Sequence, residues 1–449
     1  MIALSRTFDA AERREIRMRA IFEAGKLDPR TYDEETVAPF AIRLAPSAWR
    51  AIASLAERAW TELSAVERAL LAERRSWRAL GIPRKVRAII AASPPPSARD
   101  ARFARFDFHP TTEGWRVSEI NADVPGGFIE AGALTRIVAD RLPGLSCLPD
   151  PARILARAIA ERAPGGDAAL VHATSYTDDQ QVVRRIGAEL AALGVRAHLA
   201  SPVHVGPSGS RARLSTSGAE VDAVMRFFPC EWLGNLDRAA RGRWRALPAG
   251  IVRSNPPAAL LLQGKRLPIT MRALGIDAPT WRALVPEVGP IGLRRFAPSI
   301  VPGGSVLKPV WGRIGEGVVI DGATGASQAR RARLMARLFP KSWCVQRRFE
   351  SLPLRTAGAN AAADVGARDG AAELFHVCIG VYVVDGRAAG AYARVAPRAL
   401  IDGRAQDAAV LLDASLETSL ETSLETSLVS SRTSSLESLH EERFQHASL

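Results

Sequence analysis

Apolar positions in the first 95 residues recur at the spacing of one face of a helix. Six of them follow Ser47 at such intervals: Trp49, Ile52, Leu55, Leu63, Val66 and Leu70. This stripe predicts a long amphipathic helix with one buried face. Gly81 and Pro83 end the pattern, and three consecutive prolines at 94–96 mark a boundary. The segment 1–95 is therefore predicted to be helical.

Residues 101–125 change to a period of two, ARFARFDFHPTTEGWRVSEINADVP, which predicts a β-hairpin. If the turn falls at the Glu-Gly pair, Asp107 lies opposite Glu119. Arg105 then lies opposite Asn121, and all four side chains share one face. The other face is apolar and is expected to pack on the core: Phe106, Phe108, Ile120 and Ala122.

The middle of the chain has the pattern of a strand, a helix and a second strand. A short apolar run at 168–175 precedes a helical pattern at 184–194, and extended structure resumes at 195–200. This βαβ unit predicts a parallel sheet in the segment 96–260, with a further strand at 223–229.

Beyond residue 300 the pattern changes to short alternating stretches, typical of antiparallel strands. Asp385-Gly386 between two of them predicts a tight turn. The fold class is therefore predicted to be α/β (α+β), with a separate strand-rich subdomain at 261–412. The remaining segment, 413–449, repeats Ser-Leu-Glu-Thr, and a leucine period of four holds no single helical seam. It is predicted to be a low-complexity, disordered tail.

The net charge is +13 and the isoelectric point is about 10.4, which raises nucleic acid as a partner. The positive charge is nearly all arginine, dispersed among alanines. Lysine is rare and occurs at five positions: Lys26, Lys85, Lys265, Lys308 and Lys341. The sequence has neither an RNP-like strand nor a long basic run, so nucleic-acid binding is the minor alternative.

The sequence also indicates a cytoplasmic protein. No apolar run is long enough to span a bilayer, and the first residues lack the apolar core of a signal peptide. The cysteines form no CxxC pair and suit neither a disulfide framework nor a zinc site: Cys147, Cys230, Cys344 and Cys378. Cys230 and Cys344 are expected to be buried structural residues.

The polar face of the hairpin is a candidate magnesium site. Two opposed carboxylates repel each other unless a cation lies between them. Asp107, Glu119 and Asn121 offer the hard oxygen ligands that Mg²⁺ prefers. Arg105 beside them would face an anion, such as a phosphoryl group or a carboxylate. The alternative is a solvated face on which Arg105 neutralises Asp107.

A second candidate site follows in the C-terminal half. Lys308 lies in a predicted strand and could reach nucleotide phosphates, while glycines after it let backbone N–H groups approach phosphate oxygens. These glycines are Gly312, Gly315 and Gly317. Gln346 lies where a strand on the adenine side would run. The alternatives are an ordinary glycine-rich turn and an exposed strand glutamine.

Together these residues resemble the ATP-grasp ligase half of glutathionylspermidine synthases and of related bacterial synthase-like proteins. The family pattern runs Arg-x-Asp, a hairpin turn, Glu-x-Asn-x-Asp-x-Pro and Glu-Ala. It corresponds here to Arg105-Phe106-Asp107, residues 119–125 and Glu130-Ala131. Residues 229–232 are similar to the Pro-Trp-Glu-Trp stretch at the end of a strand in the family. Lys308-Pro309 with Gly312-Arg313 is similar to the family's phosphate loop, and the strand ending at Arg394 is similar to its late hairpin.

The resemblance implies an ATP-grasp-like fold without an amidase domain, with a pre-ATP-grasp layer at 96–260. It also implies an ATP- and Mg²⁺-dependent ligase that forms an amide through an acyl phosphate. The substrates would be a small carboxylate, such as glutathione, and an amine, such as a polyamine. The implied roles are metal binding by Asp107, Glu119 and Asn121, catalysis by Arg105 and Arg394, and ATP binding by Lys308, Gly312, Arg313, Gly315, Gly317 and Gln346.

Two positions depart from the family pattern. Ile314 replaces the Glu of Gly-Arg-Glu-Gly, and Val395 replaces the Glu that usually follows the late arginine. These departures keep a second interpretation open, in which the chain is a degenerate ATP-grasp module that binds a nucleotide or a peptide without turnover.

Overall fold

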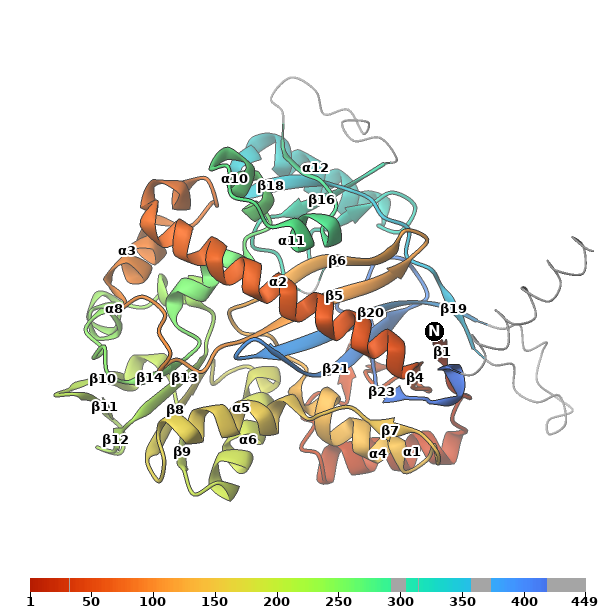
Figure 1. The fold of residues 1–449 in the computed structure, drawn as a ribbon, viewed down its shortest axis with the longest axis horizontal. Coiled ribbons are helices and arrows are strands. Elements are labelled where there is room, and N and C mark those ends of the chain that lie inside the picture. Colours follow the sequence, from red (N-terminus) through yellow and green to blue (C-terminus); the bar gives the residue numbers. More distant parts are fainter. Residues whose placement is uncertain (32, 292–303, 314, 357–372, 418–449) are drawn as a thin grey trace, which may run out of the picture.

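Figure 1 shows the computed structural model of the chain, which describes residues 1–31, 33–291, 304–313, 315–356 and 373–417. Two features from the sequence lie outside these ranges, namely Ile314 and the predicted tail from residue 418 onward. The described chain is a mixed α/β structure with several sheets, as predicted. No helix in the described ranges is long and apolar enough to cross a membrane.

The central antiparallel sheet joins the predicted hairpin to the end of the chain (Figure 1). Its strand order is β22-β21-β20-β5-β6, and β19 also pairs with β20. The strands are β5 (Phe103–Thr111), β6 (Gly114–Asn121), β19 (Leu354–Arg355), β20 (Leu374–Val384), β21 (Arg387–Ala396) and β22 (Gln406–Ala408). The segments 96–260 and 261–412 therefore share one sheet.

A parallel sheet with the order β14-β13-β8-β9 confirms the predicted βαβ unit. Its strands are β8 (Asp167–His172), β9 (Arg196–Ala200), β13 (Ala223–Phe227) and β14 (Val252–Ser254). Helix α6 (Thr177–Ala192) connects the first two, and α5 (Pro151–Arg162) packs against α6. A small sheet of β10 (Val205–Ser208), β11 (Arg211–Leu214) and β12 (Glu220–Val221) follows, as do α7 (Cys230–Leu233) and α8 (Arg238–Arg245).

A third sheet, of order β15-β18-β16-β17, builds the strand-rich subdomain and is antiparallel. Its strands are β15 (Val288–Pro290), β16 (Ser305–Pro309), β17 (Val319–Ile320) and β18 (Trp343–Arg347). The helices of this part are α9 (Leu260–Gln263), α10 (Leu267–Ala273), α11 (Pro279–Leu284) and α12 (Ala326–Leu338), with a 3₁₀ turn, η5 (Pro340–Ser342).

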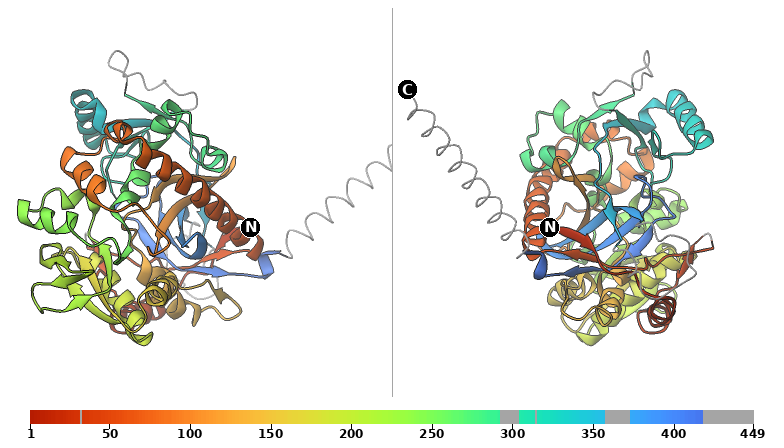
Figure 2. Two further views of the ribbon diagram at one scale, coloured as in Figure 1. Left: turned by 60° about the vertical axis from the view of Figure 1, so that its left-hand side comes forward. Right: turned by 90° about the vertical axis from the view of Figure 1, so that its right-hand side faces the viewer.

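The predicted long helix is α2 (Pro46–Ala72), which begins with a proline in its first turn. Its apolar stripe includes Ile52, Leu63, Val66 and Leu70, all fully buried. The helix contacts β20 and β21, and Figure 2 shows it along one side of the central strands. It leads into η1 (Arg74–Arg78) and α3 (Arg84–Ala92), whereas α1 (Ala10–Phe22) lies away from it at the lower edge of Figure 1.

The N-terminal segment also contains short strands that its helical pattern did not indicate. A four-stranded sheet joins β1 (Ile2–Leu4), β4 (Ile42–Leu44), β23 (Val410–Leu412) and β7 (Ser146–Cys147). β2 (Arg30–Thr31) pairs with β3 (Glu34–Glu35), and a π-helical turn, η2 (Glu130–Leu134), leads into α4 (Thr135–Ala139). These strands are two or three residues long, too short to leave a periodic signal.

The hairpin register differs from the predicted one by a bulge. Arg105 pairs with Asn121 as predicted, but Thr111 pairs with Gly114, so the turn residues are Thr112 and Glu113. The register shifts between Phe106 and Phe108, which leaves Asp107 without a single opposite residue. The predicted opposition of Asp107 and Glu119 is therefore wrong. The bulge nevertheless keeps both side chains on the cavity side.

The hairpin is fixed to the parallel sheet through a buried ion pair. The guanidinium of Arg226, on β13, donates to the carboxylate of Asp123, just after β6, and both side chains are fully buried. The other carboxylate oxygen of Asp123 accepts from the backbone N–H of Cys230 at 2.8 Å. Asn255 closes the junction, because its side-chain amide donates to the carbonyl oxygens of Phe103 and Ala122.

We expect Asp123→Ala to lower the free energy of unfolding by about 3–5 kcal/mol, because it leaves the Arg226 charge buried and unpaired. Urea unfolding followed by circular dichroism measures the change. Asp277→Ala is the control, since it breaks an ion pair with Arg282 in which both side chains are mostly exposed. That control should change stability by less than about 1 kcal/mol. Equal effects of the two substitutions would contradict the structural role of Asp123.

Candidate active site

One cavity of about 530 Å³ opens between the polar face of the hairpin, the third sheet and the parallel-sheet layer. It collects almost every site residue proposed from the sequence. Those that line it are Arg105, Asp107, Glu119, Asn121, Lys308, Gly312, Arg313, Gly315, Gln346 and Arg394. Gly317 does not line it, although it belongs to the same loop.

On the polar face of the hairpin, Arg105 and Asp107 form a bidentate ion pair. Nε and Nη2 of Arg105 donate to the two carboxylate oxygens of Asp107 at 2.6 and 2.9 Å. Nη1 of Arg105 donates to the carbonyl oxygen of Gly126, and its guanidinium lies over the ring of Tyr392 at 5.3 Å. Burial raises the pKa of Asp107, against the opposing effect of Arg105. The arginine is thus held rigidly at the cavity wall.

Lys265, which the sequence analysis did not select, is part of this site. Its ammonium lies 2.9 Å from Oε2 of Glu119 and donates to the carbonyl oxygen of Gly312 at 2.7 Å. Burial alone would raise the pKa of Glu119, but the ammonium of Lys265 holds it at about 2. The scarcity of lysine in this arginine-rich chain was the signal that could have identified Lys265.

Lys308 lies in β16, as predicted, and is buried. Its ammonium donates to the carbonyl oxygen of Ser118 at 3.2 Å. The pKa of Lys308 is lowered to about 8, chiefly by burial, with a contribution from the nearby Lys265 and against the opposing effect of Glu119. Gln346, on the adjacent strand β18, is also buried, so the alternative of an exposed strand glutamine is wrong.

The glycine loop after β16 has no room for side chains at its key positions. A Cβ on Gly312 would lie 2.4 Å from Pro309, and one on Gly315 would lie 2.7 Å from the carbonyl oxygen of Ile401. Gly315 also has a φ of 68°, which favours glycine. Arg313 reaches from this loop to the parallel-sheet layer, where it pairs with Glu231 and its guanidinium lies 5.6 Å from the ring centre of Trp232.

Two further residues of the site lie on the central sheet. Arg394 lines the cavity from β21 and donates to the carbonyl oxygen of Asp402. His109 lines it from β5, and burial lowers its pKa to about 3, so the imidazole is neutral. Val395, the departure noted next to Arg394, is buried in the core.

Oxygen ligands for a divalent cation are present on the hairpin. Nδ2 of Asn121 lies 3.1 Å from Oδ2 of Asp107 and 3.5 Å from Oε1 of Glu119, so both carboxylates converge on one amide. Turning that amide by 180° would present its oxygen at the same place. This donor set fits Mg²⁺, which also keeps water and phosphate ligands. No group of three or more His, Cys, Asp and Glu side chains suited to a metal occurs in the described ranges.

A second set of carboxylates lines the same cavity, here called the acidic cluster: Asp28, Glu130, Asp178, Asp179 and Asp407. The buried ammonium of Lys26 contacts three of them, at 2.5 Å from Glu130, 2.9 Å from Asp28 and 3.1 Å from Asp407. Burial raises the pKa of Glu130 to about 7 and that of Asp179 to about 6.

The sequence analysis selected Glu130 only as part of a motif and did not select the other four carboxylates. They come from distant segments, and no short-range spacing relates them. Asp178 and Asp179 stand in the first turn of α6, where acidic residues are common for helix stability alone.

Comparison with known proteins gives a family and a fold. The model of the glutathionylspermidine synthase preATP-grasp family matches residues 28–407. A glutathione synthetase-like effector from Globodera pallida, solved in its apo form, superposes with a TM-score of 0.60 at 11% identity, over 90% of this chain and 96% of that one. A second solved chain, assigned as a gamma-glutamylcysteine synthetase of Methylobacillus flagellatus, gives a TM-score of 0.39 at 13% identity over 74% and 82%. No curated protein matches the sequence.

The lowered pKa of Lys308 predicts how the free energy of unfolding depends on pH. Between pH 8 and 10.5 the unfolded chain binds more protons at this lysine than the folded chain, so the wild type gains stability as pH rises. The Lys308→Met variant has no ionisable group at this position, so it lacks this pH dependence. We expect the free energy of unfolding of the variant to exceed that of the wild type by about 1–3 kcal/mol at pH 7. This excess should shrink toward pH 10.5.

Urea unfolding at several pH values measures this difference. Lys85→Met is the control, because Lys85 is an exposed lysine on α3 and should give no pH-dependent difference. If the free energies of unfolding of Lys308→Met and of the wild type differ by a constant amount from pH 7 to 10.5, the pKa of Lys308 is not lowered in the folded protein.

Proposed function

Because the chain belongs to the glutathionylspermidine synthase preATP-grasp family, we propose that it is an ATP- and Mg²⁺-dependent ligase that joins a carboxylate to an amine. The observation that carries the proposal is the content of a single cavity. Lysine and arginine side chains, a glycine loop, hairpin oxygen ligands and an acidic cluster all line it. A ligase of this kind must hold phosphates, a carboxylate and an amine next to one another.

The nucleotide phosphates would bind between the glycine loop and the two lysines. Lys265 and Lys308 supply compact positive charges, and the loop supplies backbone N–H groups at positions where a Cβ would collide. Gln346, buried on β18, would lie on the adenine side. The hairpin oxygens of Asp107, Glu119 and Asn121 would hold Mg²⁺, which neutralises charge on the phosphate oxygens when bound.

In the first step, an oxygen of the substrate carboxylate attacks the γ-phosphorus of ATP. The bond to the β–γ bridging oxygen breaks, ADP leaves, and an acyl phosphate forms. In the second step, the nitrogen of the neutral amine attacks the acyl carbon, the bond to the phosphate oxygen breaks, and the proton that the nitrogen loses leaves with the phosphate as hydrogen phosphate. Arg105 and Arg394 would stabilise the negative charge that both steps place near the carboxyl carbon. Neither step requires a nucleophilic side chain.

The acidic cluster would bind the amine. An amine substrate is a cation at neutral pH, and the carboxylates that line the cavity are its natural partners. Lys26 already compensates part of this charge, through Asp28, Glu130 and Asp407. Asp178 and Asp179 make no ion pair with a lysine or arginine in the described ranges, so they are the carboxylates left for a substrate ammonium. A small amine or a polyamine fits this arrangement, with a small peptide as the carboxylate.

Nucleotide or peptide binding without turnover is the second candidate. It is favoured by the ion pairs within the cavity, because Arg105 and Lys265 already occupy carboxylate oxygens of Asp107 and Glu119. A metal ion would have to displace these contacts. Release of ADP that depends on both a carboxylate and an amine distinguishes a ligase from a module that only binds.

We expect Glu119→Gln to reduce ADP release by at least a hundredfold, because it removes a hairpin carboxylate and the counter-ion of Lys265. ADP would be measured with ATP, Mg²⁺, a panel of small peptides and amino acids, and spermidine or hydroxylamine as the amine. Hydroxylamine converts an acyl phosphate to a hydroxamate, which reports the intermediate directly.

Glu113→Gln is the matched control, because Glu113 lies in the turn of the same hairpin, is exposed and does not line the cavity, although Arg347, one of its two ion-pair partners, does. Its ADP release should equal that of the wild type. Full activity of a folded Glu119→Gln protein would exclude the hairpin from the catalytic site. ATP binding by the wild type without ADP release in any mixture would favour the second candidate.

The amine assignment predicts a selective effect of the two free carboxylates. Asp178→Asn with Asp179→Asn should raise the KM for the amine about tenfold, equivalent to about 1.4 kcal/mol, and leave the KM for ATP within about twofold. Initial rates at varied amine and ATP concentrations measure both values. Glu161→Gln, on the exposed side of α5, should change neither value. An equal rise in both KM values would place the pair at the nucleotide instead.

A further inference from the structure

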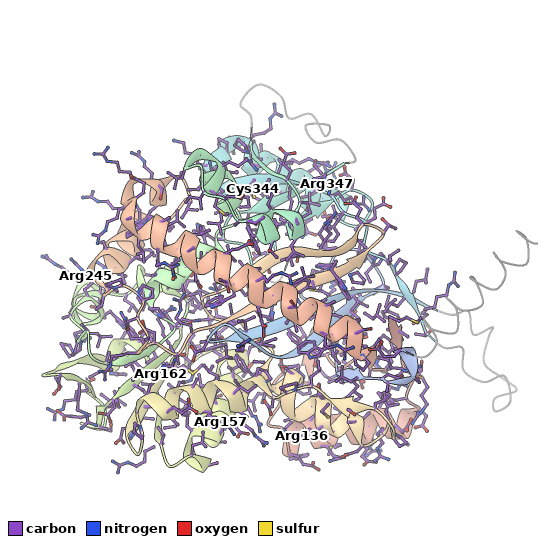
Figure 3. All side chains as sticks on the ribbon, viewed as in Figure 1. Arg136, Arg157, Arg162, Arg245, Cys344 and Arg347 are labelled. Atoms are coloured by element: carbon purple, nitrogen blue, oxygen red, sulfur yellow. The ribbon has the colours of Figure 1, made fainter. Side chains whose placement is uncertain are left out.

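A second charged surface lies outside the cavity, on η1, α3 and α8. Seven exposed cations define it and form what we call the α3–α8 surface: Arg74, Arg75, Arg78, Arg84, Lys85, Arg238 and Arg245. Helices α3 and α8 are in contact, and η1 is separated from α3 by only five residues. Figure 1 shows α3 and α8 together at the left edge, and Figure 3 shows Arg245 there. None of the seven residues lines the cavity.

None of these seven cations has an acidic partner among the described residues. Other arginines are paired internally, as in Arg102 with Glu67 and Arg253 with Asp100. On the α3–α8 surface the acids closest in sequence are Glu73 and Asp237. The carboxylate of Asp237 accepts from the backbone N–H of Ala240 as the cap of α8. The surface therefore keeps a strong positive excess.

The surface also lacks apolar anchors. None of the large hydrophobic side chains exposed in the described ranges falls within residues 73–93 or 234–250. Trp77 and Trp244 of these segments are buried. A membrane surface is normally entered by exposed aromatic or aliphatic residues, and protein interfaces are centred on them. A bare array of cations instead suits a hydrated polyanion, because contacts to phosphate need only charge.

The seven cations are spread over three neighbouring elements, η1, α3 and α8. Several separated cations match the repeated charges of a nucleic-acid backbone better than they match a single small anion.

We propose that the α3–α8 surface binds the sugar-phosphate backbone of a nucleic-acid duplex without sequence preference. The binding is independent of the cavity and of any ligase activity. Exposed aromatic residues, on which unpaired bases would stack, do not occur in these segments of the described chain, so the duplex is the expected form. Such contacts release counter-ions, and the affinity must fall steeply with salt concentration.

The test is fluorescence anisotropy with labelled 20-base-pair DNA and RNA duplexes of mixed sequence, from 50 to 200 mM salt. The variant reverses four cations: Arg75→Glu, Arg84→Glu, Lys85→Glu and Arg245→Glu. We expect the wild type to bind with micromolar affinity at 50 mM salt and the variant to bind at least tenfold more weakly. The slope of log affinity against log salt should become shallower by about 3–4, because each phosphate contact contributes about 0.9.

A matched control variant has the same net charge but changes exposed arginines on α1, α5 and α6 instead: Arg13→Glu, Arg14→Glu, Arg157→Glu and Arg184→Glu. These arginines are exposed, and Figure 3 shows Arg157 at the lower edge, away from Arg245. The control should keep the affinity within about threefold. Equal loss in both variants would show attraction by net charge alone and would overturn the proposal.

Absence of duplex binding by the wild type at 50 mM salt would also overturn it. A third arm uses vesicles of phosphatidylcholine with phosphatidylserine. Tighter binding to these vesicles than to the duplexes, lost in the first variant and kept in the control, would assign the surface to a membrane instead. Circular dichroism of both variants confirms that the substituted proteins are folded.

Discussion

The antiparallel pairing of β5 with β20 is the contact on which both the fold and the cavity depend. It places residues 103–108 beside 379–384, two segments far apart in the chain, and so joins the early hairpin to the late one. One face of the joined sheet packs against α2, and the other carries Arg105, Asp107 and Arg394 into the cavity. Gly380 lies opposite Asp107, and a Cβ there would come within 2.6 Å of Cδ of Arg105. Glycine at this position lets the guanidinium lie across the sheet, where the carboxylate of Asp107 holds it.

Buried charges within the cavity are neutralised by other residues of the chain. Each carboxylate on the hairpin contacts a cation, and Lys26 compensates three members of the acidic cluster in the same way, namely Asp28, Glu130 and Asp407. Burying unpaired charge would cost several kcal/mol per ion, so a cavity with this many ionised groups is stable only if they are paired. Except at Asp178 and Asp179, a ligand would therefore exchange partners with the protein rather than find free charges. That exchange favours ligands that bring both signs of charge, as a metal–nucleotide complex and an ammonium do together.

The hairpin and the residues of its polar face could be predicted from the sequence because they are local. The period of two, the turn residues and the motif all lie within 25 residues, and Arg105, Asp107, Glu119 and Asn121 indeed meet at one wall. The β-bulge was missed, since a single inserted residue leaves the alternation almost unchanged. The acidic cluster and Lys265 were missed for a different reason. They reach the cavity through sheet pairing and helix placement over the whole chain, which no pattern within a short window records.

The cations that give the sequence its excess positive charge fall into two groups: those paired with carboxylates of the chain and those that face solvent without such a partner. Many arginines neutralise internal acids, as Arg226 does for Asp123 and Arg253 for Asp100, and contribute to folding rather than to binding. Their electric field is cancelled within a few ångströms by the paired carboxylate. The α3–α8 surface has no such compensation among the described residues, so its field extends into solvent over roughly a Debye length, about 10 Å at 0.1 M salt. Net charge alone could not separate the two groups, because composition counts a paired arginine and a free one alike. Only the placement of the carboxylates shows where the positive charge of this chain is available to a partner.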